Sequence, residues 1–359
     1  MGLLRRSTIE NKTAQKLEQL KNILIGKKAL LIVMQDFPDP DALASAAALR
    51  ELAHVLSGTP CTVTSGGSFG RSENAALARY LRLPYHRLKK IDPVNYDVIA
   101  MVDTQPETGN NSLPAEVAVQ IVIDHHPIRR ATRSVPFTDI RNQYGACSTI
   151  LFEYLTGAGI DIDTPTATAL LYGIRSDTQD MGRESRKADI DAFVALYPVA
   201  NKRMLGEIQK SKTSPSYFKL LSTALLNSRV YGRTLISNAG IIDIPDILGE
   251  IADLMLRNEE IDWALCYGFY DNRMLISLRT SDSKGDSGAI IRRIVSGQGT
   301  GGGHRTMAGG QIPLKEGSAD EKKKTEELVQ KRYLKALKSS DRKGISLLKL
   351  NPTTKDEKS

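Results

Sequence analysis

Three short apolar runs in the first half of the chain each end in side chains that can bind a metal ion or transfer a proton. The runs are residues 29–34 before Asp39 and Asp41, residues 96–102 before Asp103, and residues 117–123 before Asp124-His125-His126. Another strand-like run at 61–64 and helix-like segments at 41–56 and 74–81 alternate with them. This alternation predicts an α/β fold with a parallel sheet and crossover helices. Parallel sheets bind ligands beyond the carboxyl ends of their strands, where these polar residues fall.

The length of the chain predicts two domains, because 359 residues exceed the ~100–200 residues of a usual single domain. The predicted division is an α/β domain at 1–205, a helical linker at 206–230, a smaller α/β domain at 231–316, and a charged helix and tail at 317–359.

Outside the first sheet, the pattern of apolar residues predicts helices in the first domain and both strands and helices in the second. Expected there are helices at 7–25, 149–156 and 165–174, a turn at 175–178 that presents Asp177, and a helical pattern from 190 to 230. In the second domain the expected elements are strands 234–237, 263–270 and 274–279, helices 243–257, 288–295 and 321–337, and a glycine-rich loop at 301–310.

Composition restricts the compartment more than the function. The 49 Lys and Arg exceed the 41 Asp and Glu, which favours an anionic partner or serves only solubility. Three cysteines are too few for a disulfide framework and indicate a reducing compartment. The chain has neither the apolar region of a signal peptide at its start nor an apolar run of the ~18 residues that a membrane span needs. A cytoplasmic protein without membrane contact is therefore expected.

The polar residues at the strand ends predict a metal centre. Asp39 and Asp41 flank a stiff proline, and two such close carboxylates repel unless a cation neutralises them, although an Asp-Pro-Asp turn alone is usually a helix cap. Adjacent histidines in an extended stretch point to opposite sides, so one can bind metal while the other faces substrate. The full candidate set is Asp39, Asp41, Asp103, His125 and Asp177.

The candidate set is rich in oxygen and has no sulfur, which suits Mn²⁺ or Mg²⁺ better than structural Zn²⁺. Two cations ~3.5–4 Å apart can share a carboxylate and activate a bridging water for hydrolysis at phosphorus. Asp103 is the candidate for the shared carboxylate.

A second motif, Gly301 to Gly310, indicates an anion site. Glycines let backbone N–H groups approach an anion, and His304 and Arg305 add donors and charge. Arg279 shares a strand face with Ser277 and could grip a phosphate. The simpler alternatives are a flexible loop and an exposed strand arginine.

These motifs, in this order, resemble the DHH phosphoesterase superfamily, in particular members with a C-terminal DHH-associated domain. The matching segments are Asp39-Pro40-Asp41-Ala42, Asp103, Asp124-His125-His126, Asp177-Thr178, Gly301 to His304 and Ala308-Gly309-Gly310. The resemblance spans most of residues 29–314 and implies a RecJ-like first domain with two manganese ions, a small substrate-binding second domain, and an active-site cleft between them.

The resemblance also implies a role for each matched residue. Asp39 and Asp103 would hold one metal, and Asp41, Asp103, His125 and Asp177 the other. His126 would face the substrate or leaving group, and Asp124 would support the imidazoles, which makes Asp103, His126 and Asp124 the catalytic candidates. The residues that would hold the distal phosphate or nucleotide are Ser277, Arg279, Gly302, Gly303 and His304.

The implied substrates are short RNA or DNA, linear dinucleotides or nucleoside bisphosphates. Polyphosphate is an alternative, and a homodimer is an option that the sequence does not decide. One position departs from the pattern, since many relatives have a metal-binding histidine where this chain has Gln35. Three consequences stay open: a weaker first metal site, compensation by Asp36, or a protein that binds its ligand without catalysis.

Overall fold

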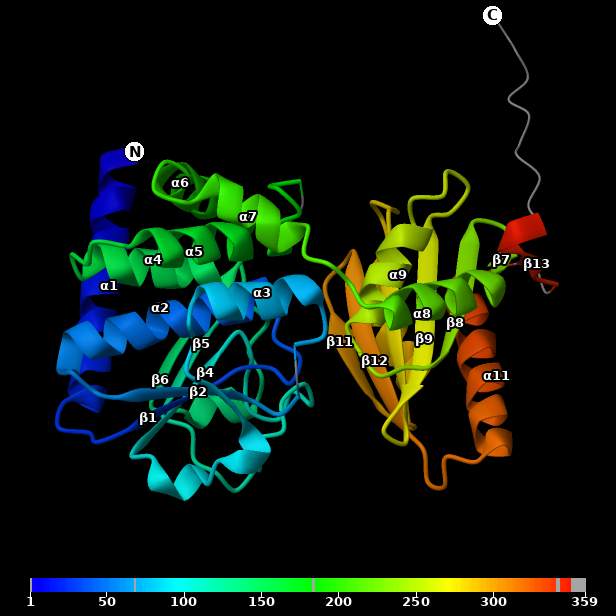
Figure 1. Cartoon of the computed structure of the whole chain (residues 1–359), viewed down its shortest axis with the longest axis horizontal. Coiled ribbons are helices and arrows are strands. Elements are labelled where there is room, and N and C mark those ends of the chain that lie inside the picture. Colours follow the sequence, from blue (N-terminus) through cyan, green and yellow to red (C-terminus); the bar gives the residue numbers. More distant parts are fainter. Residues whose placement is uncertain (1, 68, 183–184, 340–342, 350–359) are drawn as a thin grey trace, which may run out of the picture. The chain divides into compact units, whose positions relative to one another are not determined.

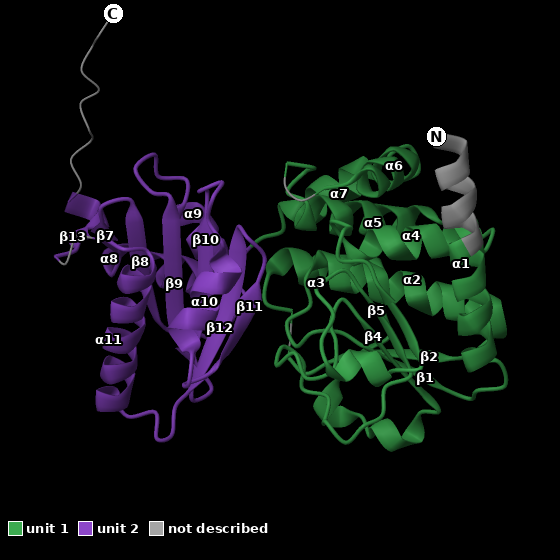
Figure 2. Ribbon diagram, turned by 180° about the vertical axis from the view of Figure 1, so that it is seen from behind, with its two compact units in different colours: residues 1–212 green, residues 213–359 purple. Residues whose placement is uncertain are grey.

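The computed structural model describes residues 2–67, 69–182, 185–339 and 343–349, and the side chains from residue 12 onward. The chain forms two compact units, residues 1–212 and 213–359 (Figures 1 and 2). The boundary between the units lies within the range 206–230, where the sequence suggested a linker. Residues 350–359 of the charged tail lie outside the described part. No helix of the described part is both long and apolar enough to cross a membrane.

Unit 1 is built on a fully parallel sheet with the strand order β3-β2-β1-β4-β5-β6. Its strands are β1 (Leu30–Val33), β2 (Cys61–Ser65), β3 (Tyr85–Arg87), β4 (Val98–Val102), β5 (Ile121–Asp124) and β6 (Phe137–Ile140). The order reverses between β1 and β4, so the segments that follow these two strands diverge and leave a crevice at their carboxyl ends. The polar motifs follow β1, β4 and β5 and therefore gather at this crevice.

Alternate residues of the strands pack on opposite faces of this sheet. Leu30 and Ile32 face the helical layer, whereas Leu31 and Val33 face a smaller cluster under the loops and 3₁₀ turns. The helices of unit 1 are α1 (Gly2–Leu24), α2 (Pro40–Ser57), α3 (Ser72–Tyr80), α4 (Cys147–Gly157), α5 (Thr164–Asp177), α6 (Lys187–Leu196) and α7 (Lys202–Gln209). Alanines of α2 let it approach α4 and α5 closely, and Gly58 in the left-handed region (φ 68°) ends it.

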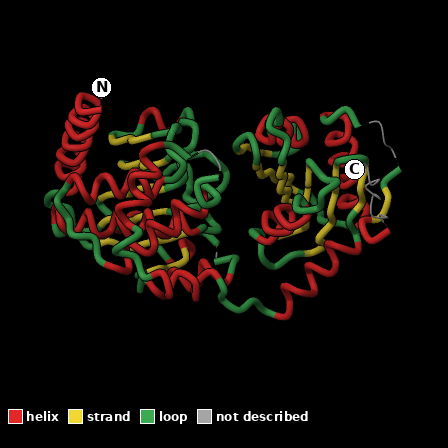
Figure 3. Tube along the Cα trace, turned by 90° about the horizontal axis from the view of Figure 1, so that it is seen from above, coloured by secondary structure: helices red, strands yellow, loops and turns green. Residues whose placement is uncertain are grey.

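Unit 2 carries a mixed seven-stranded sheet in the order β11-β12-β10-β9-β8-β7-β13. The strands are β7 (Arg229–Tyr231), β8 (Thr234–Ile241), β9 (Trp263–Tyr270), β10 (Arg273–Thr280), β11 (Thr300–Gly303), β12 (Met307–Pro313) and β13 (Ile345–Ser346). The helices are α8 (Pro215–Leu226), α9 (Ile247–Met255), α10 (Ser287–Val295) and α11 (Ala319–Ala336). One apolar cluster joins α10 and α11 to one face of the sheet, and another joins α8 and α9 to the opposite face. Figure 3 shows helices on both sides of the strands of this unit.

The predicted fold class, a parallel-sheet α/β domain followed by a smaller α/β domain, is confirmed. Several local expectations were wrong. The glycine-rich segment is not a loop but the hairpin of β11 and β12, because its backbone pairs along an edge of the sheet. Asp177 is the last residue of α5 rather than part of a turn, and β7 interrupts the pattern expected to stay helical to 230. Strands β3 and β6 were not anticipated, since both are short.

Candidate metal centre

Asp39 and Asp41 come from the turn between β1 and α2 and are held by helix ends. Asp39 is the N-cap of α2, and its Oδ1 accepts the Ala42 N–H at 2.9 Å. Asp41 is fully buried, and its two oxygens accept the N–H groups of Cys147 and Ser148, each at 2.7 Å. These amides open α4, whose own N-cap position holds an alanine without a capping side chain. Asp41 therefore caps a second helix from across the crevice.

Asp103 follows β4 in a strained conformation. Its φ is +55°, in the left-handed region that costs most residues free energy, and its N–H donates to the Ile123 carbonyl at 3.1 Å. The side chain is buried, and neither carboxylate oxygen accepts a hydrogen bond from any described residue. Uncompensated burial of a carboxylate costs several kcal/mol. A strained backbone and a buried carboxylate that accepts no hydrogen bond from a described residue are typical of a ligand-binding residue.

His125 directs one ring nitrogen into a group of carboxylates. Its Nδ1 lies 3.2 Å from the Tyr144 carbonyl, which can only accept, so Nδ1 carries a hydrogen. Its Nε2 lies 3.3 Å from Asp177, 3.5 Å from Asp103 and 4.0 Å from Asp41. A backbone carbonyl that fixes the tautomer in this way is the usual support of a metal-binding histidine.

His126 has a separate environment. Its Nδ1 lies 2.8 Å from Asp124 Oδ1, and its side chain is 39% exposed, whereas that of His125 is 5% exposed. The expectation that the two rings point to opposite sides was wrong, because the chain bends directly after β5 and the ring centroids lie 4.3 Å apart. The difference between the two imidazoles is therefore one of exposure and partner.

Gln105 holds Asp124 in place. Its fully buried amide donates to Asp124 Oδ2 at 2.7 Å, while its Oε1 accepts the Arg129 N–H and the Thr132 hydroxyl, each at 2.8 Å. Asp124 Oδ1 also accepts the N–H of His126 at 3.1 Å. The chain Gln105–Asp124–His126 thus orients an exposed imidazole by hydrogen bonds from a buried core.

Gln35 is hydrogen-bonded to Asp39, whereas Asp36 is hydrogen-bonded to two loops. The Gln35 amide donates to Asp39 Oδ2 at 2.9 Å. Asp36 instead accepts the Gly66 N–H at 3.1 Å and both the N–H and the hydroxyl of Ser112, at 2.8 and 2.6 Å. Its carboxylate anchors two loops, so the structure gives no support to the idea that Asp36 replaces the histidine missing at position 35.

The electrostatics of the centre are those of a cation site. Burial, and then the Asp177 carboxylate, raise the pKa of Asp41 to about 7 and that of Asp39 to about 6. Burial, and then the Asp39 carboxylate, raise the pKa of Asp103 well above its ordinary range. Burial would lower the pKa of His125, but Asp103 and Asp177 raise it well above its usual value. Like charges crowd together here, and added positive charge would relieve them.

Asp124 behaves differently from the other carboxylates. Burial alone would raise its pKa, but His126, His125 and Gln105 together hold it below its ordinary range. The pKa of Asp124 is therefore lowered, whereas those of Asp39, Asp41 and Asp103 are raised.

Two overlapping groups of side chains could each hold a divalent cation. Within each group the ligand atoms lie within 4.8 Å of one another. The groups are Asp41, His125 and Asp177, and Asp103, Asp124, His125 and His126. Mostly oxygen donors with imidazole nitrogen and no thiolate fit Mn²⁺ or Mg²⁺, and the bare carboxylate of Asp103 meets the requirement of a ligand. Asp39 belongs electrostatically to the same cluster, because Asp177 and His126 both perturb it.

The candidate phosphate-binding residues gather in unit 2. Strands β11, β12 and β10 align Gly302, Gly309 and Ser277 at one level of the sheet. Gly303 has φ +147°, and a Cβ there would lie 2.4 Å from the Ala308 Cα, so the position requires glycine. Arg279 does not project alone, since its guanidinium donates to Asp253 and to Ser277 Oγ, both at 2.9 Å.

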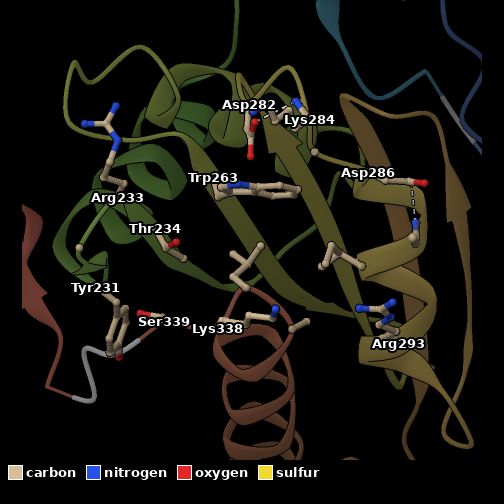
Figure 4. Close-up of a pocket in the computed structure, with 16 residues that line it drawn as sticks. Tyr231, Arg233, Thr234, Trp263, Asp282, Lys284, Asp286, Arg293, Lys338 and Ser339 are labelled. Atoms are coloured by element: carbon tan, nitrogen blue, oxygen red, sulfur yellow. Dashed lines mark hydrogen bonds between the residues drawn. The ribbon is translucent and has the colours of Figure 1, made fainter.

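Unit 2 also contains a cavity of about 750 Å³ beside Trp263. Figure 4 shows the Trp263 indole among the lining side chains, with Arg233, Lys284, Arg293 and Lys338 around it. The indole is 8% exposed, so it forms part of the wall and offers little surface for stacking.

Several residues of the centre carry no signal that a single sequence reveals. Gln105 and the Tyr144 carbonyl act through hydrogen bonds to Asp124 and His125, and the amides of Cys147 and Ser148 act through Asp41. In the sequence, a glutamine in a loop cannot be distinguished from other glutamines, and a backbone group cannot be distinguished from other backbone groups. Only their place beside the motif residues distinguishes them.

Comparison with protein families settles the class of this architecture. Residues 30–174 match the N-terminal domain of the DHH family, and residues 234–332 match the DHHA1 domain. The chain belongs to the DHH family. The first match covers every strand of unit 1, and the second runs from β8 into α11 of unit 2.

Individual relatives of this DHH-family chain differ in name. An uncharacterized protein of Methanocaldococcus jannaschii is 35% identical over 320 residues, which are 84% of this chain and 65% of that protein. An A-adding tRNA nucleotidyltransferase of Aquifex aeolicus is 28% identical over 68% of this chain and 29% of the enzyme. A probable manganese-dependent inorganic pyrophosphatase of Staphylococcus saprophyticus is 26% identical over 46% of this chain and 53% of that protein. The chain thus spans less than two thirds of each of these relatives.

A solved structure supports the fold independently. The exopolyphosphatase-related protein of Bacteroides fragilis superposes with a TM-score of 0.70 over 91% of this chain and 98% of that one, at 17% identity. At this identity the likeness concerns the fold alone.

Proposed function

We propose that this DHH-family chain is a metal-dependent phosphoesterase that hydrolyses short oligonucleotides, linear dinucleotides or nucleoside bisphosphates. The observation that carries the proposal is Asp103, which combines a strained backbone with a buried carboxylate that accepts no hydrogen bond from a described residue. It belongs to one of two groups of metal-type side chains, and His125 is common to both groups. The name of the staphylococcal relative, a probable manganese-dependent pyrophosphatase, supports manganese and phosphorus–oxygen chemistry.

In this proposal the role of each residue follows from its surroundings. Asp39 and Asp103 would hold one of two Mn²⁺ or Mg²⁺ ions, and Asp41, Asp103, His125 and Asp177 would hold the other. Such a pair of ions supplies a water of lowered pKa and charge for the transferring phosphoryl group. His126, exposed and oriented by Asp124, delivers a proton to the leaving oxygen. The residues that receive the distal phosphate are Ser277, Arg279, Gly302, Gly303 and His304.

The test is a substrate panel with purified protein and Mn²⁺. A linear dinucleotide, a short RNA, a nucleoside bisphosphate, pyrophosphate and polyphosphate are compared by release of product. Asp103→Asn removes the proposed shared ligand at nearly constant volume, and Asp161→Asn changes an exposed aspartate of the same unit as control. Loss of a residue that only supports a metal ligand costs about 10–100-fold, so loss of Asp103 should exceed about 100-fold. Full activity of Asp103→Asn, or no turnover of any substrate with metal bound, would overturn the proposal.

A second candidate function is a nucleotide binder with weakened catalysis, and Gln35 supports it. The amide at this position donates to Asp39 Oδ2, where a histidine would offer a nitrogen ligand. With one protein ligand fewer, the ion at Asp39 and Asp103 is held more weakly. Tight binding of a dinucleotide with no release of product, in the presence of excess Mn²⁺, would favour this function over the first.

A further inference from the structure

Another cavity, in unit 1, is lined by cationic and aromatic side chains without any acidic ones. It has a volume of about 660 Å³ and lies between α3, β3 and the segment that follows α7. Its principal side chains are Phe69, Ser72, Arg79, Arg82, Tyr85 and Lys212. We call this feature the α3 groove.

The positive charge of the α3 groove is not neutralised. Arg79, Arg82 and Lys212 are exposed, and among the described residues none of the three side chains forms an ion pair or a hydrogen bond. Other surface arginines of the chain differ, for example Arg203, which pairs with Glu207 at 3.1 Å. Several like charges that converge on one hollow attract an anion more strongly than single charges spread over a surface.

Arg82 occupies a backbone position that favours glycine. It follows α3 with φ +47°, and the Leu83 N–H returns to the Ala78 carbonyl at 3.2 Å. A helix end of this form usually carries glycine, because a side chain costs free energy in the left-handed region. The chain bears this cost and places a guanidinium beside the groove.

The aromatic wall of the α3 groove is partly exposed, and hydrogen bonds hold one of its two rings. The rings of Phe69 and Tyr85 lie with centroids 4.7 Å apart. The Tyr85 hydroxyl donates to the Gly67 carbonyl at 2.8 Å and contacts Ser65 Oγ at 2.9 Å, which fixes its ring. Ser72 Oγ donates to the Ser211 carbonyl at 3.2 Å and closes the other side. Flat, half-buried rings beside cations are what an unstacked nucleobase and its phosphate require.

The α3 groove and the candidate metal centre share a support. Asn74 of α3 is 1% exposed, and its amide donates at 3.0 Å to the carbonyl of Pro38, the residue before Asp39. The helix that carries Arg79 is thereby tied to the turn that carries Asp39 and Asp41. A ligand in the groove is therefore held on the same rigid body as the site of chemistry.

We propose that the α3 groove binds single-stranded nucleic acid, and specifically nucleotides of the substrate beyond those held at the metal centre. A base would pack on Phe69 and Tyr85, and phosphates would face Arg79, Arg82 and Lys212. The inference rests on the proposed function for the identity of the substrate, but binding at the groove does not require hydrolysis. Duplexes are excluded as the preferred ligand, because their bases are stacked and cannot reach the rings.

The test measures binding separately from catalysis. Fluorescently labelled single-stranded RNA of six nucleotides and a labelled dinucleotide are titrated with full-length protein that carries Asp103→Asn, and anisotropy is recorded at several salt concentrations. Into this background are introduced Arg79→Ala with Arg82→Ala, and separately Phe69→Leu, which keeps an apolar side chain and removes the flat ring. The matched control is Lys89→Ala with Lys90→Ala, two exposed lysines that do not line the groove.

The double arginine variant should weaken hexamer binding by about tenfold and change dinucleotide binding less than about twofold. It should also lower the salt dependence by about 1.4 in the slope of log K against log salt, at about 0.7 for each phosphate that the protein no longer neutralises. Phe69→Leu should weaken the hexamer by about fivefold, as expected for one stacked base.

Equal effects of the arginine and lysine pairs would overturn the proposal. So would an unchanged affinity in Phe69→Leu, or equally tight competition by polyglutamate, because either result describes an anion patch without base recognition. These outcomes are independent of whether the wild-type chain hydrolyses any substrate.

Discussion

Raising the pH in the absence of metal should destabilise unit 1 through its buried carboxylates. The ordinary pKa of an aspartate is 3.8, and that of Asp41 is raised to about 7 by burial and by the Asp177 carboxylate. Between these two values the folded chain holds a proton that the unfolded chain has released. The free energy of unfolding therefore falls as the pH rises from about 4 to about 7, and the loss is complete above the raised pKa.

The size of this effect follows from the raised pKa of Asp41, to which burial contributes most and repulsion by Asp177 contributes next. A pKa raised from 3.8 to about 7 corresponds to about 4 kcal/mol, at about 1.36 kcal/mol for each pH unit. Ligand oxygens of Asp41 and Asp177 lie within 4.8 Å of each other, and two unit charges at that distance repel by about 3.5 kcal/mol at an effective dielectric constant of about 20. Bound Mn²⁺ should offset this repulsion and raise the free energy of unfolding at pH 8. At pH 5 it should contribute little, because bound protons already neutralise the carboxylates.

Calorimetric unfolding at pH 5, 6.5 and 8, with EDTA or with excess Mn²⁺, measures the effect. Trp263, the single tryptophan, lies in unit 2, so its fluorescence follows that unit and far-ultraviolet circular dichroism follows both. Metal-free Asp103→Asn should be more stable than wild type at pH 8, since the substitution removes a buried charge whose pKa burial and Asp39 raise. Asp161→Asn should match wild type.

Three results would refute this reasoning. One is a metal-free stability that stays constant or rises between pH 5 and pH 8. Another is equal stabilisation by Mn²⁺ at both ends of that range. The third is a full response to Mn²⁺ in Asp103→Asn.

Three further predictions follow from individual contacts. Gln35→His should tighten Mn²⁺ binding, measured by calorimetric titration, because an imidazole replaces the amide that donates to Asp39; unchanged affinity would show that the position does not face the metal. Gln105→Leu should lower kcat by about 10–100-fold with little change in KM, since it releases Asp124 and His126, and an unaltered kcat would exclude Gln105 as a positioning residue. Gly303→Ala should destabilise unit 2 by about 1–3 kcal/mol in urea unfolding followed by Trp263 fluorescence. Gly309→Ala, in the same hairpin and with only the Ile276 carbonyl oxygen at 3.8 Å from the added methyl, should not.

The sequence predicted those parts of the molecule that depend on local pattern. Strand-length apolar runs, each followed by aspartate or histidine, indicate which residues meet at the carboxyl edge of the sheet, and Asp39, Asp103 and His125 do meet there. Strands β9 and β10 were located within a residue or two for the same reason.

Features that depend on tertiary partners escaped prediction. The glycines of β11 have low strand propensity, and only pairing with β12 makes them a strand. The proximity of His125 and His126 follows from a bend after β5, and no sequence period describes a bend. Gln105 became visible only when folding brought it to Asp124.

Asp41 has two roles, and this changes how substitutions at its position in relatives should be interpreted. Its carboxylate is both a candidate metal ligand and the cap of α4 through Cys147 and Ser148. A descendant that abandoned metal chemistry would still need an acceptor there to keep that helix, so an aspartate at this position says little about catalysis. Asp103 has no such structural role, since no described residue donates a hydrogen bond to its carboxylate oxygens. Its retention or loss is therefore the more informative marker when inactive relatives are separated from active ones.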